Sequence, residues 1–368
     1  MNEANVKVSP RQMMFLLAGF VLGSTLLLSF MDNLARQDSW IVIIAAFVCC
    51  IPFVLSVAFL VKRFPGMSFI DILCAIYGRV IGSAVFLSYI GYVFIILAFN
   101  LRDIADFYIG FVLPEMPMPA LLIVIMLVSA YGVHKGILSI AKIGFLSLVY
   151  AVVTILLTFA LLIKDMDFTN FLPVLEIQGQ TFVKGTHVMT AVPYCEVFVL
   201  MMLAPSLSST KKLGGTALGG VGIAAFCFLA ITVRNIAVLG PSTAIYAGNS
   251  YQAARMINIS ESLTRVELIT AIGITISLFV KISVLFYAAA NGTSQLLRLR
   301  SPSPLILPLG ALAVVLAMIA FESTVSHTAD ASRYHPFFPF PFAIILPPLT
   351  LLVAAIRGLP KQKETGGS

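Results

Sequence analysis

The sequence predicts an all-α polytopic membrane protein with ten transmembrane helices, arranged as two five-helix halves that run in opposite directions. The chain of 368 residues is 60% hydrophobic and only 11% charged, whereas about a quarter of the residues of a soluble domain are charged. Apolar runs of about 20 residues, long enough to cross a bilayer as a helix, recur along the whole chain. The first and the sixth of these runs each contain a break.

The ten runs define the expected spans. The first run begins at Pro10 and is followed by no small-residue cleavage site, so we interpret it as a retained span and not as a signal peptide. Residues 66–79 are too short and too mixed to cross a bilayer, and we expect them to form an interfacial helix. The expected spans are residues 10–30, 39–62, 80–112, 117–133, 138–163, 186–204, 215–239, 264–294, 304–321 and 337–356.

Lys and Arg residues predict the orientation, because cytoplasmic loops carry more of them than outer loops. With both termini in the cytoplasm, the inner side holds fourteen: Lys7, Arg11, Lys62, Arg63, Arg79, Lys135, Lys142, Lys211, Lys212, Arg298, Arg300, Arg357, Lys361 and Lys363. The outer side then holds seven: Arg36, Lys164, Lys184, Arg234, Arg255, Arg265 and Arg333. Because these residues follow the loops between spans, the net charge of +7 indicates membrane orientation and argues against a nucleic-acid partner.

The long loop at 164–185 separates a first five-helix repeat, residues 10–163, from a second, residues 186–356. An odd number of spans per repeat inverts the second repeat relative to the first. The first span has its break at residues 19–25 and the sixth at residues 190–196. Two interrupted segments in corresponding positions point to a transporter-type binding site. The alternative is a pair of ordinary kinks, since Gly and Pro are common in membrane helices.

Short motifs in a fixed order add a family resemblance. They are Arg11-Gln12, Arg36-Gln37-Asp38-Ser39-Trp40, Arg63-Phe64-Pro65-Gly66, Asn100-Leu101-Arg102-Asp103, Leu113-Pro114-Glu115-Met116-Pro117, Tyr131-Gly132-Val133-His134-Lys135-Gly136 and Asn170-Phe171-Leu172-Pro173-Val174. Over residues of about 8 to 300, this set resembles the B subunits of bacterial spore germinant receptors, the GerAB family within the amino acid–polyamine–organocation superfamily.

The resemblance and the ten-span pattern together imply a LeuT-like 5+5 inverted repeat with broken first and sixth helices. The resemblance also implies a multi-pass protein of the spore inner membrane that assembles with an A subunit and a lipoprotein C subunit. It implies that a small-molecule nutrient binds and triggers germination. The residues themselves show no nucleotide-binding loop and no metal-type spacing, so we expect no cofactor and no metal.

The two breaks and a charged residue on the eighth span define the expected site near the middle of the bilayer. Helix breaks free backbone N–H and C=O groups, which can hold the carboxylate and ammonium of an amino acid. Glycine leaves room for a ligand to approach the backbone. The expected ligand-binding residues of this group are Gly19, Gly23, Ser24, Thr25, Val192, Pro193, Tyr194, Glu196, Ser277 and Lys281.

Glu196 and Lys281 are the most informative ionisable residues, because a lone charge in hydrocarbon is costly. We expect both to face the bundle interior and to stabilise each other directly or through water. Lys281 lies where sodium-coupled relatives of this fold place a cation, so its ammonium could replace that ion. A purely structural pairing is the alternative. Tyr92, Phe99 and Asn100 of the third span complete the expected site as a side wall, with ordinary helix packing as the alternative.

The remaining polar residues point to no enzyme. Asp103 and Asp106 share a helix face, and we expect them in a wetted outer vestibule or at a subunit contact. The four histidines and five cysteines show no metal-type spacing. The small and apolar residues at the breaks favour a small neutral amino acid as the nutrient. The leading hypothesis is a nutrient-sensing receptor subunit. The alternatives are a proton-coupled amino acid permease, with Glu196 as the titrating group, and a structural scaffold.

Overall fold

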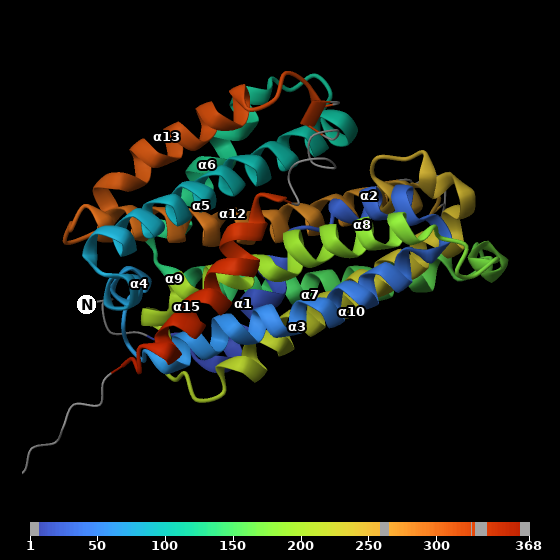
Figure 1. Cartoon of the computed structure of the whole chain (residues 1–368). Coiled ribbons are helices and arrows are strands. Elements are labelled where there is room, and N and C mark those ends of the chain that lie inside the picture. The colour runs from blue at the N-terminus through green and yellow to red at the C-terminus, as the bar shows by residue number, and fades with distance from the viewer. Residues whose placement is uncertain (1–6, 258–264, 325, 328–336, 361–368) are drawn as a thin grey trace, which may run out of the picture.

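The computed structural model describes residues 7–257, 265–324, 326–327 and 337–360, and helices make up nearly all of them (Figure 1). The helices that carry the fold are α1 (Pro10–Leu22), α2 (Leu27–Ala35), α3 (Ser39–Arg63), α4 (Phe69–Tyr77), α5 (Arg79–Phe107), α6 (Met118–His134), α7 (Ile137–Leu162), α8 (Gly179–Met189), α9 (Leu200–Leu203), α10 (Leu213–Leu239), α11 (Asn249–Arg255), α12 (Glu267–Leu296), α13 (Ser303–Ile319) and α15 (Leu346–Ile356).

Within the described residues, six helical segments are long and apolar enough to cross a membrane, and four apolar helices are shorter. The six are Leu27–Arg63, Arg79–Val112, Ile137–Leu162, Gly179–Ser206, Leu213–Ala244 and Glu267–Leu296. The four are Pro10–Leu22, Met118–His134, Ser303–Ile319 and Phe340–Ile356. The expected spans therefore appear as long and short helices and not as ten full-length ones. The first is short because α1 stops at its break.

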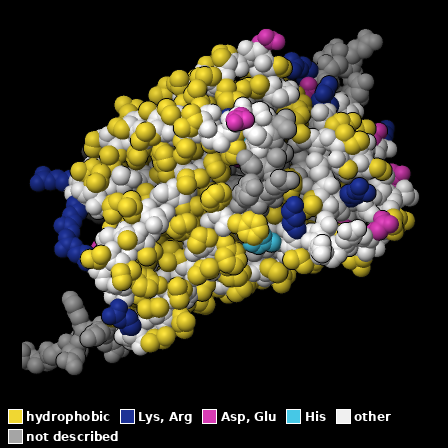
Figure 2. All heavy atoms as spheres, turned by 45° about the horizontal axis from the view of Figure 1, so that its top comes forward, with side chains coloured by type: hydrophobic (Ala, Val, Ile, Leu, Met, Phe, Trp, Pro, Cys, Tyr) yellow, Lys and Arg dark blue, Asp and Glu magenta, His cyan; other side chains and the backbone are white. Residues whose placement is uncertain are grey.

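The surface and the ends of the bundle fit a membrane protein. Hydrophobic side chains cover most of the face between the two ends, and Lys and Arg side chains gather at the ends (Figure 2). The short helix α4, which we expected at the interface, lies at one end (Figure 1). The segment that connects α7 to α8 lies at the other end. The bilayer therefore surrounds the hydrophobic middle.

The first break lies between α1 and α2. A capping box starts α1: the Gln12 N–H donates to Ser9 Oγ and the Ser9 N–H donates to Gln12 Oε1. From residue 24 the backbone bonds tighten to the three-residue spacing, with the N–H groups of Ser24, Thr25 and Leu27 donating to carbonyls three residues earlier. Such a tightened turn changes the direction of the helix. The sequence prediction of a break here is confirmed.

The second break is also confirmed, and it is longer than expected. The helix starts at Gly179, seven residues before the expected start. The more polar residues that precede the apolar run already form its first helical turns. It then passes through a π-helical stretch, Thr190–Tyr194, and a 3-10 stretch, Cys195–Val199. Pro193 lies inside the π-helical stretch, where it has no N–H to give to the helix.

Two family motifs fasten the long loop that connects α7 to α8. Asp38 accepts hydrogen bonds from the N–H groups of Leu175 (2.8 Å) and Ile177 (2.9 Å). Asn170 Nδ2 donates to the Ala237 carbonyl at 3.1 Å. A charged acceptor strengthens the first two bonds, so this loop is tied to the start of α3 and to the end of α10.

The opposite end of the bundle is closed by the N-terminal segment. The Val8 N–H donates to the Ser206 carbonyl at 2.8 Å, and the Ser208 N–H donates to the Val8 carbonyl at 3.0 Å. Deeper in the bundle, Tyr89 packs edge-on against Phe198 and its hydroxyl donates to the Phe198 carbonyl. These contacts close the end of the bundle that lies opposite the loop between α7 and α8.

A buried polar cluster holds α2 to α10 and α11. Asn235 links two buried charges: its Oδ1 accepts from Arg234 Nη2 at 2.8 Å, and its Nδ2 donates to Asp32 Oδ2 at 3.4 Å. Asn249 Nδ2 also donates to Asp32 Oδ2, at 3.1 Å. Arg234, which the orientation count placed on the outer side, is buried near the end of α10 with a side chain that is 2% exposed. Three residues of the orientation count, Arg333, Lys361 and Lys363, lie outside the described residues.

Candidate functional site

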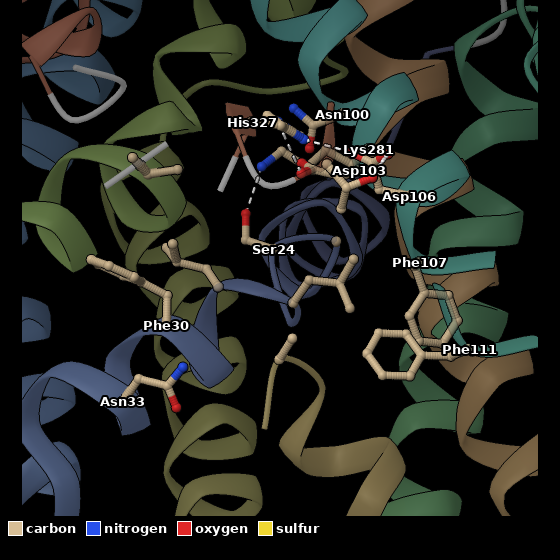
Figure 3. Close-up of a pocket in the computed structure, with 16 residues that line it drawn as sticks. Ser24, Phe30, Asn33, Asn100, Asp103, Asp106, Phe107, Phe111, Lys281 and His327 are labelled. Carbon is tan, nitrogen blue, oxygen red and sulfur yellow. Dashed lines mark hydrogen bonds and ion pairs between the residues drawn. The ribbon is translucent and has the colours of Figure 1, made fainter. Parts of the chain in front are cut away.

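A cavity of about 210 Å³ lies beside the first break (Figure 3). Helices α2 and α5 and the first break supply most of its wall, and α12 contributes Lys281. Its lining residues are Gly23, Ser24, Leu26, Leu27, Phe30, Asn33, Asn100, Asp103, Asp106, Phe107, Phe111, Val192, Ala247, Lys281, Thr324 and His327. The polar side chains of α5 and α12 gather at one end of the cavity together with His327. The cavity is therefore polar at the break and apolar along α2 and the outer part of α5.

Lys281 connects the two breaks. Its Nζ donates to Ser24 Oγ at 2.5 Å and lies 2.6 Å from Glu196 Oε2. The ammonium also lies 5.7 Å from the centre of the Phe20 ring. A lysine has three N–H donors, so two of them are directed at Ser24 and Glu196. Lys281 also lines the cavity, whereas Glu196 lies behind it. The predicted pairing of these two charges is confirmed as a direct contact.

A second group of charges lies at the same end of the cavity. Arg102 Nε donates to both Asp106 oxygens, at 3.0 and 3.1 Å. Asp106 also accepts from Thr324 Oγ1 at 2.8 Å and lies 2.8 Å from His327 Nδ1. The second ring nitrogen of His327, Nε2, lies 3.6 Å from Asp103 Oδ1. These contacts bind the segment after α13 to α5.

His327 lies outside the membrane-spanning helices, and its surroundings shift its protonation. Burial disfavours the charged imidazolium. The hydrogen bond with Asp106 and the negative charges of Asp103 and Asp106 outweigh that effect and raise the pKa of His327 above its ordinary value of 6.5, although Arg102 opposes them. The protonated form is therefore favoured more than in an isolated histidine.

The structure brings five of the thirteen predicted site residues to the cavity: Gly23, Ser24, Asn100, Val192 and Lys281. Thr25 and Ser277 line a second cavity of about 40 Å³. Pro193 is buried in the π-helical stretch, and Tyr92, Phe99 and Tyr194 pack against other aromatic rings. Tyr92, for example, stacks on Phe342 at 4.8 Å between ring centroids. For Tyr92 and Phe99 the packing alternative describes the contacts that they make, and Tyr194 packs in the same way.

The two glycines of the first break make room for helices and not only for a ligand. A Cβ atom on Gly19 would lie 2.9 Å from the Gly144 carbonyl oxygen on α7. A Cβ atom on Gly23 would lie 2.6 Å from Lys281 Cβ and 2.9 Å from the Ser277 carbonyl oxygen. Close backbone approach of this kind is how small residues pack membrane helices. Gly23 therefore serves both the cavity and the contact with α12, and Gly19 serves packing alone.

Several lining residues were missed, and part of that set carries a signal in the sequence. Asn100, Asp103, Phe107 and Phe111 are spaced by three and four residues, so they share one face of the third span. Asn100 belonged to the expected wall and Asp103 was expected in a vestibule or at a subunit contact, so extending the wall along that face would have added Phe107 and Phe111. Ala247 and Thr324 belong to connections between helices, and their position shows no periodicity that points to the cavity.

Comparison with known proteins decides the family. The sequence matches the family described as "Spore germination protein" over residues 7–326. The chain belongs to that family. The match agrees with the resemblance to the GerAB family that the motifs show. "Spore germination protein KB" of Bacillus subtilis (strain 168) is 26% identical over 371 residues, which cover 98% of this chain and 98% of the relative. "Putative spore germination protein YfkT" of the same organism is 24% identical over 334 residues, covering 88% and 89%.

Solved structures give the fold of this family member. MhsT in complex with L-phenylalanine matches with a TM-score of 0.65 at 13% identity, covering 94% of this chain and 88% of that chain. Mhp1, a nucleobase-cation-symport-1 family transporter, matches with a TM-score of 0.67 at 10% identity, covering 97% and 91%. At these identities the likeness establishes the fold alone. The expected LeuT-type architecture is confirmed, and the chain is a membrane protein and not an enzyme.

Proposed function

We propose that this chain is the nutrient-sensing subunit of a spore germinant receptor and that a small neutral amino acid binds in the cavity beside the first break. It would act in the spore inner membrane, with both termini in the cytoplasm and with A and lipoprotein C subunits as partners. Binding would trigger germination through these partners. Family membership supports the coarse role, and the geometry of the cavity supports the ligand.

The observation that carries the ligand class is a cavity with fixed groups of both signs at a helix break. Lys281 offers the N–H that Ser24 and Glu196 do not use, and Ser24 accepts from Lys281, so its own hydroxyl hydrogen is free to donate. Asp103 offers a carboxylate in the same cavity. An amino acid carries one carboxylate and one ammonium, so it can pair with the Lys281 ammonium and with the Asp103 carboxylate at the same time.

The backbone of the break supports the same ligand. Among the described residues, the Leu26 N–H has no backbone acceptor and the Gly23 carbonyl has no backbone donor. Leu26 immediately precedes α2, so its N–H lies at the positive end of a helix, where anions bind favourably. The N–H suits a ligand carboxylate and the carbonyl suits a ligand ammonium.

The size of the cavity favours a small ligand. Pockets for drug-sized molecules measure about 300–1,000 Å³, and this cavity has about 210 Å³. Its apolar part, formed by Leu27, Phe30, Phe107 and Phe111, suits an uncharged side chain. A sugar or a nucleoside would leave these apolar groups against hydroxyls and would not use the two charges.

The alternatives predict different behaviour. A proton-coupled permease needs a carboxylate that exchanges protons with water, and Glu196 is 0% exposed and paired with Lys281. A structural scaffold needs no ligand at all. The buried pair therefore argues against Glu196 as the titrating group of a permease, and the cavity argues against a scaffold without a ligand.

Two measurements test the proposal. Purified full-length chain should be stabilised against thermal unfolding by at least one of L-alanine, L-valine and L-phenylalanine, because a ligand that binds only the native state must stabilise it. The stabilisation should be equal in sodium and in potassium buffer if the Lys281 ammonium takes the place of a sodium ion. Proteoliposomes should show no uptake of the stabilising amino acid. Uptake driven by a proton gradient would establish the permease instead, and stabilisation by none of the three would refute the ligand class.

A further inference from the structure

The Lys and Arg side chains at the cavity pair with two carboxylates, and the third carboxylate, Asp103, faces only the His327 imidazole. Arg102 forms a two-point contact with Asp106, and Lys281 contacts Glu196 at 2.6 Å. Each pair joins one positive and one negative side chain. Asp103 has no such partner among Lys and Arg residues within the described part of the chain.

The remaining contact of Asp103 is weak. His327 Nε2 lies 3.6 Å from Asp103 Oδ1, which is beyond hydrogen-bond distance. The same imidazole lies 2.8 Å from Asp106 through its other nitrogen, so its orientation is set by Asp106. No donor among the described residues makes a hydrogen bond to the Asp103 carboxylate. The Asp103 side chain is 36% exposed, and it lines the cavity.

A carboxylate in this position favours a cationic ligand group. The surroundings are the interior of a membrane protein, where an unpaired charge is costly unless water or a counter-charge reaches it. A protonated amine gives a charge-assisted hydrogen bond, which is about twice as strong as a neutral one. A hydroxyl can also donate to the carboxylate, but it brings no positive charge to balance it. The position of the carboxylate thus selects by charge and not by shape.

We infer that Asp103 is the specificity-determining residue that requires a protonated amino group on the ligand. The inference rests on the proposed function and deepens it, because it fixes the orientation of the ligand: the ammonium lies against Asp103 on α5, and the carboxylate lies against Ser24 and Lys281. Amino acids are accepted and hydroxy acids of the same shape are rejected. Asp106, which already has three partners, positions His327 and the segment after α13.

The test measures a ratio of affinities. Dissociation constants of the purified full-length chain are determined by calorimetry for L-alanine and L-lactate, and likewise for L-valine with 2-hydroxyisovalerate and L-phenylalanine with phenyllactate. In the wild type the amine should be preferred by at least about tenfold, because the hydroxy acid leaves the charge of Asp103 without a counter-charge. Asp103→Asn keeps the shape and removes the charge, so its preference should fall to about one. Asp103→Glu keeps the charge and should retain a preference.

The outcomes separate the inference from the function on which it rests. A wild-type preference that survives in Asp103→Asn overturns the role of Asp103 while leaving amino acid binding intact. Equal wild-type affinity for L-alanine and L-lactate overturns it without any variant. A purely structural role for Asp103 would lower the melting temperature of Asp103→Asn and leave the ratio unchanged. If no amino acid of the three binds the wild type, the proposed function itself fails.

Discussion

Lys281 Nζ lies 2.6 Å from Glu196 Oε2, and the two side chains are 2% and 0% exposed. Lys281 belongs to α12 and Glu196 to the 3-10 stretch of the second break. Apart from this contact, neither Glu196 oxygen accepts a hydrogen bond from a described residue. The carboxylate therefore depends on Lys281, and Lys281 in turn holds Ser24 of the first break. One ammonium connects both interrupted helices.

The first prediction concerns this pair. Lys281→Met leaves Glu196 as a lone buried charge and should lower the free energy of unfolding by about 3–5 kcal/mol, as found when one partner of a buried pair is removed. The double change Glu196→Gln with Lys281→Met leaves no lone charge and should recover part of that loss. A double-mutant cycle on detergent-extracted protein measures the coupling. A coupling energy of zero would show that the two charges do not stabilise each other.

The second prediction concerns the glycine that contacts α12. In Gly23→Ala the added methyl group would lie 2.6 Å from Lys281 Cβ and 2.9 Å from a backbone oxygen, so the helices must separate. We expect destabilisation of about 1–3 kcal/mol, the usual cost of overpacking, measured by thermal unfolding. Gly91→Ala on α5 is the matched control, because nothing lies within 4 Å of its added Cβ. Equal melting temperatures for the two variants would contradict the close contact.

The third prediction concerns pH. The raised pKa of His327 means that the imidazolium stabilises the native state below its ordinary value of 6.5, and that this stability is lost as pH rises through the higher native pKa. His327→Asn should cost about 1.5–3 kcal/mol at pH 6, the value of a hydrogen bond to a charged group, and less at pH 9. Melting temperatures of wild type and variant at both pH values give this difference. A difference that grows with pH would show the opposite sign of linkage.

The fourth prediction concerns orientation. With both termini in the cytoplasm, the connection between α12 and α13 faces inward and the connection between α7 and α8 faces outward. Ser301 and Gln178 are exposed residues of these two connections. In a background without the five native cysteines, Gln178→Cys should react with an impermeant maleimide in intact cells. Ser301→Cys should react only after permeabilisation. The reverse pattern would place the termini outside.

Much of the architecture follows from the sequence because the bilayer restricts it. A spanning segment must be long, apolar and internally hydrogen-bonded, so the apolar runs locate the helices and Pro193 and Gly23 locate the breaks. A lone charge at mid-depth is costly. The rise of 1.5 Å per residue places both Glu196 and Lys281 at that depth, which made their pairing predictable. The division into two five-helix repeats remains a prediction from topology.

Tertiary structure decided which face of each helix lines the cavity. Membrane helices are apolar on nearly all sides, so they lack the amphipathic pattern that marks the inner face of a soluble helix. Tyr92 and Asp103 lie on the same helix, yet Tyr92 packs against Phe342 and Asp103 lines the cavity. His327 contacts Asp106 across 221 positions of sequence, and no local pattern encodes that distance. The rotation of α5 and the position of the segment after α13 are both fixed by packing. Together they place Asp103 at the cavity with no Lys or Arg partner among the described residues.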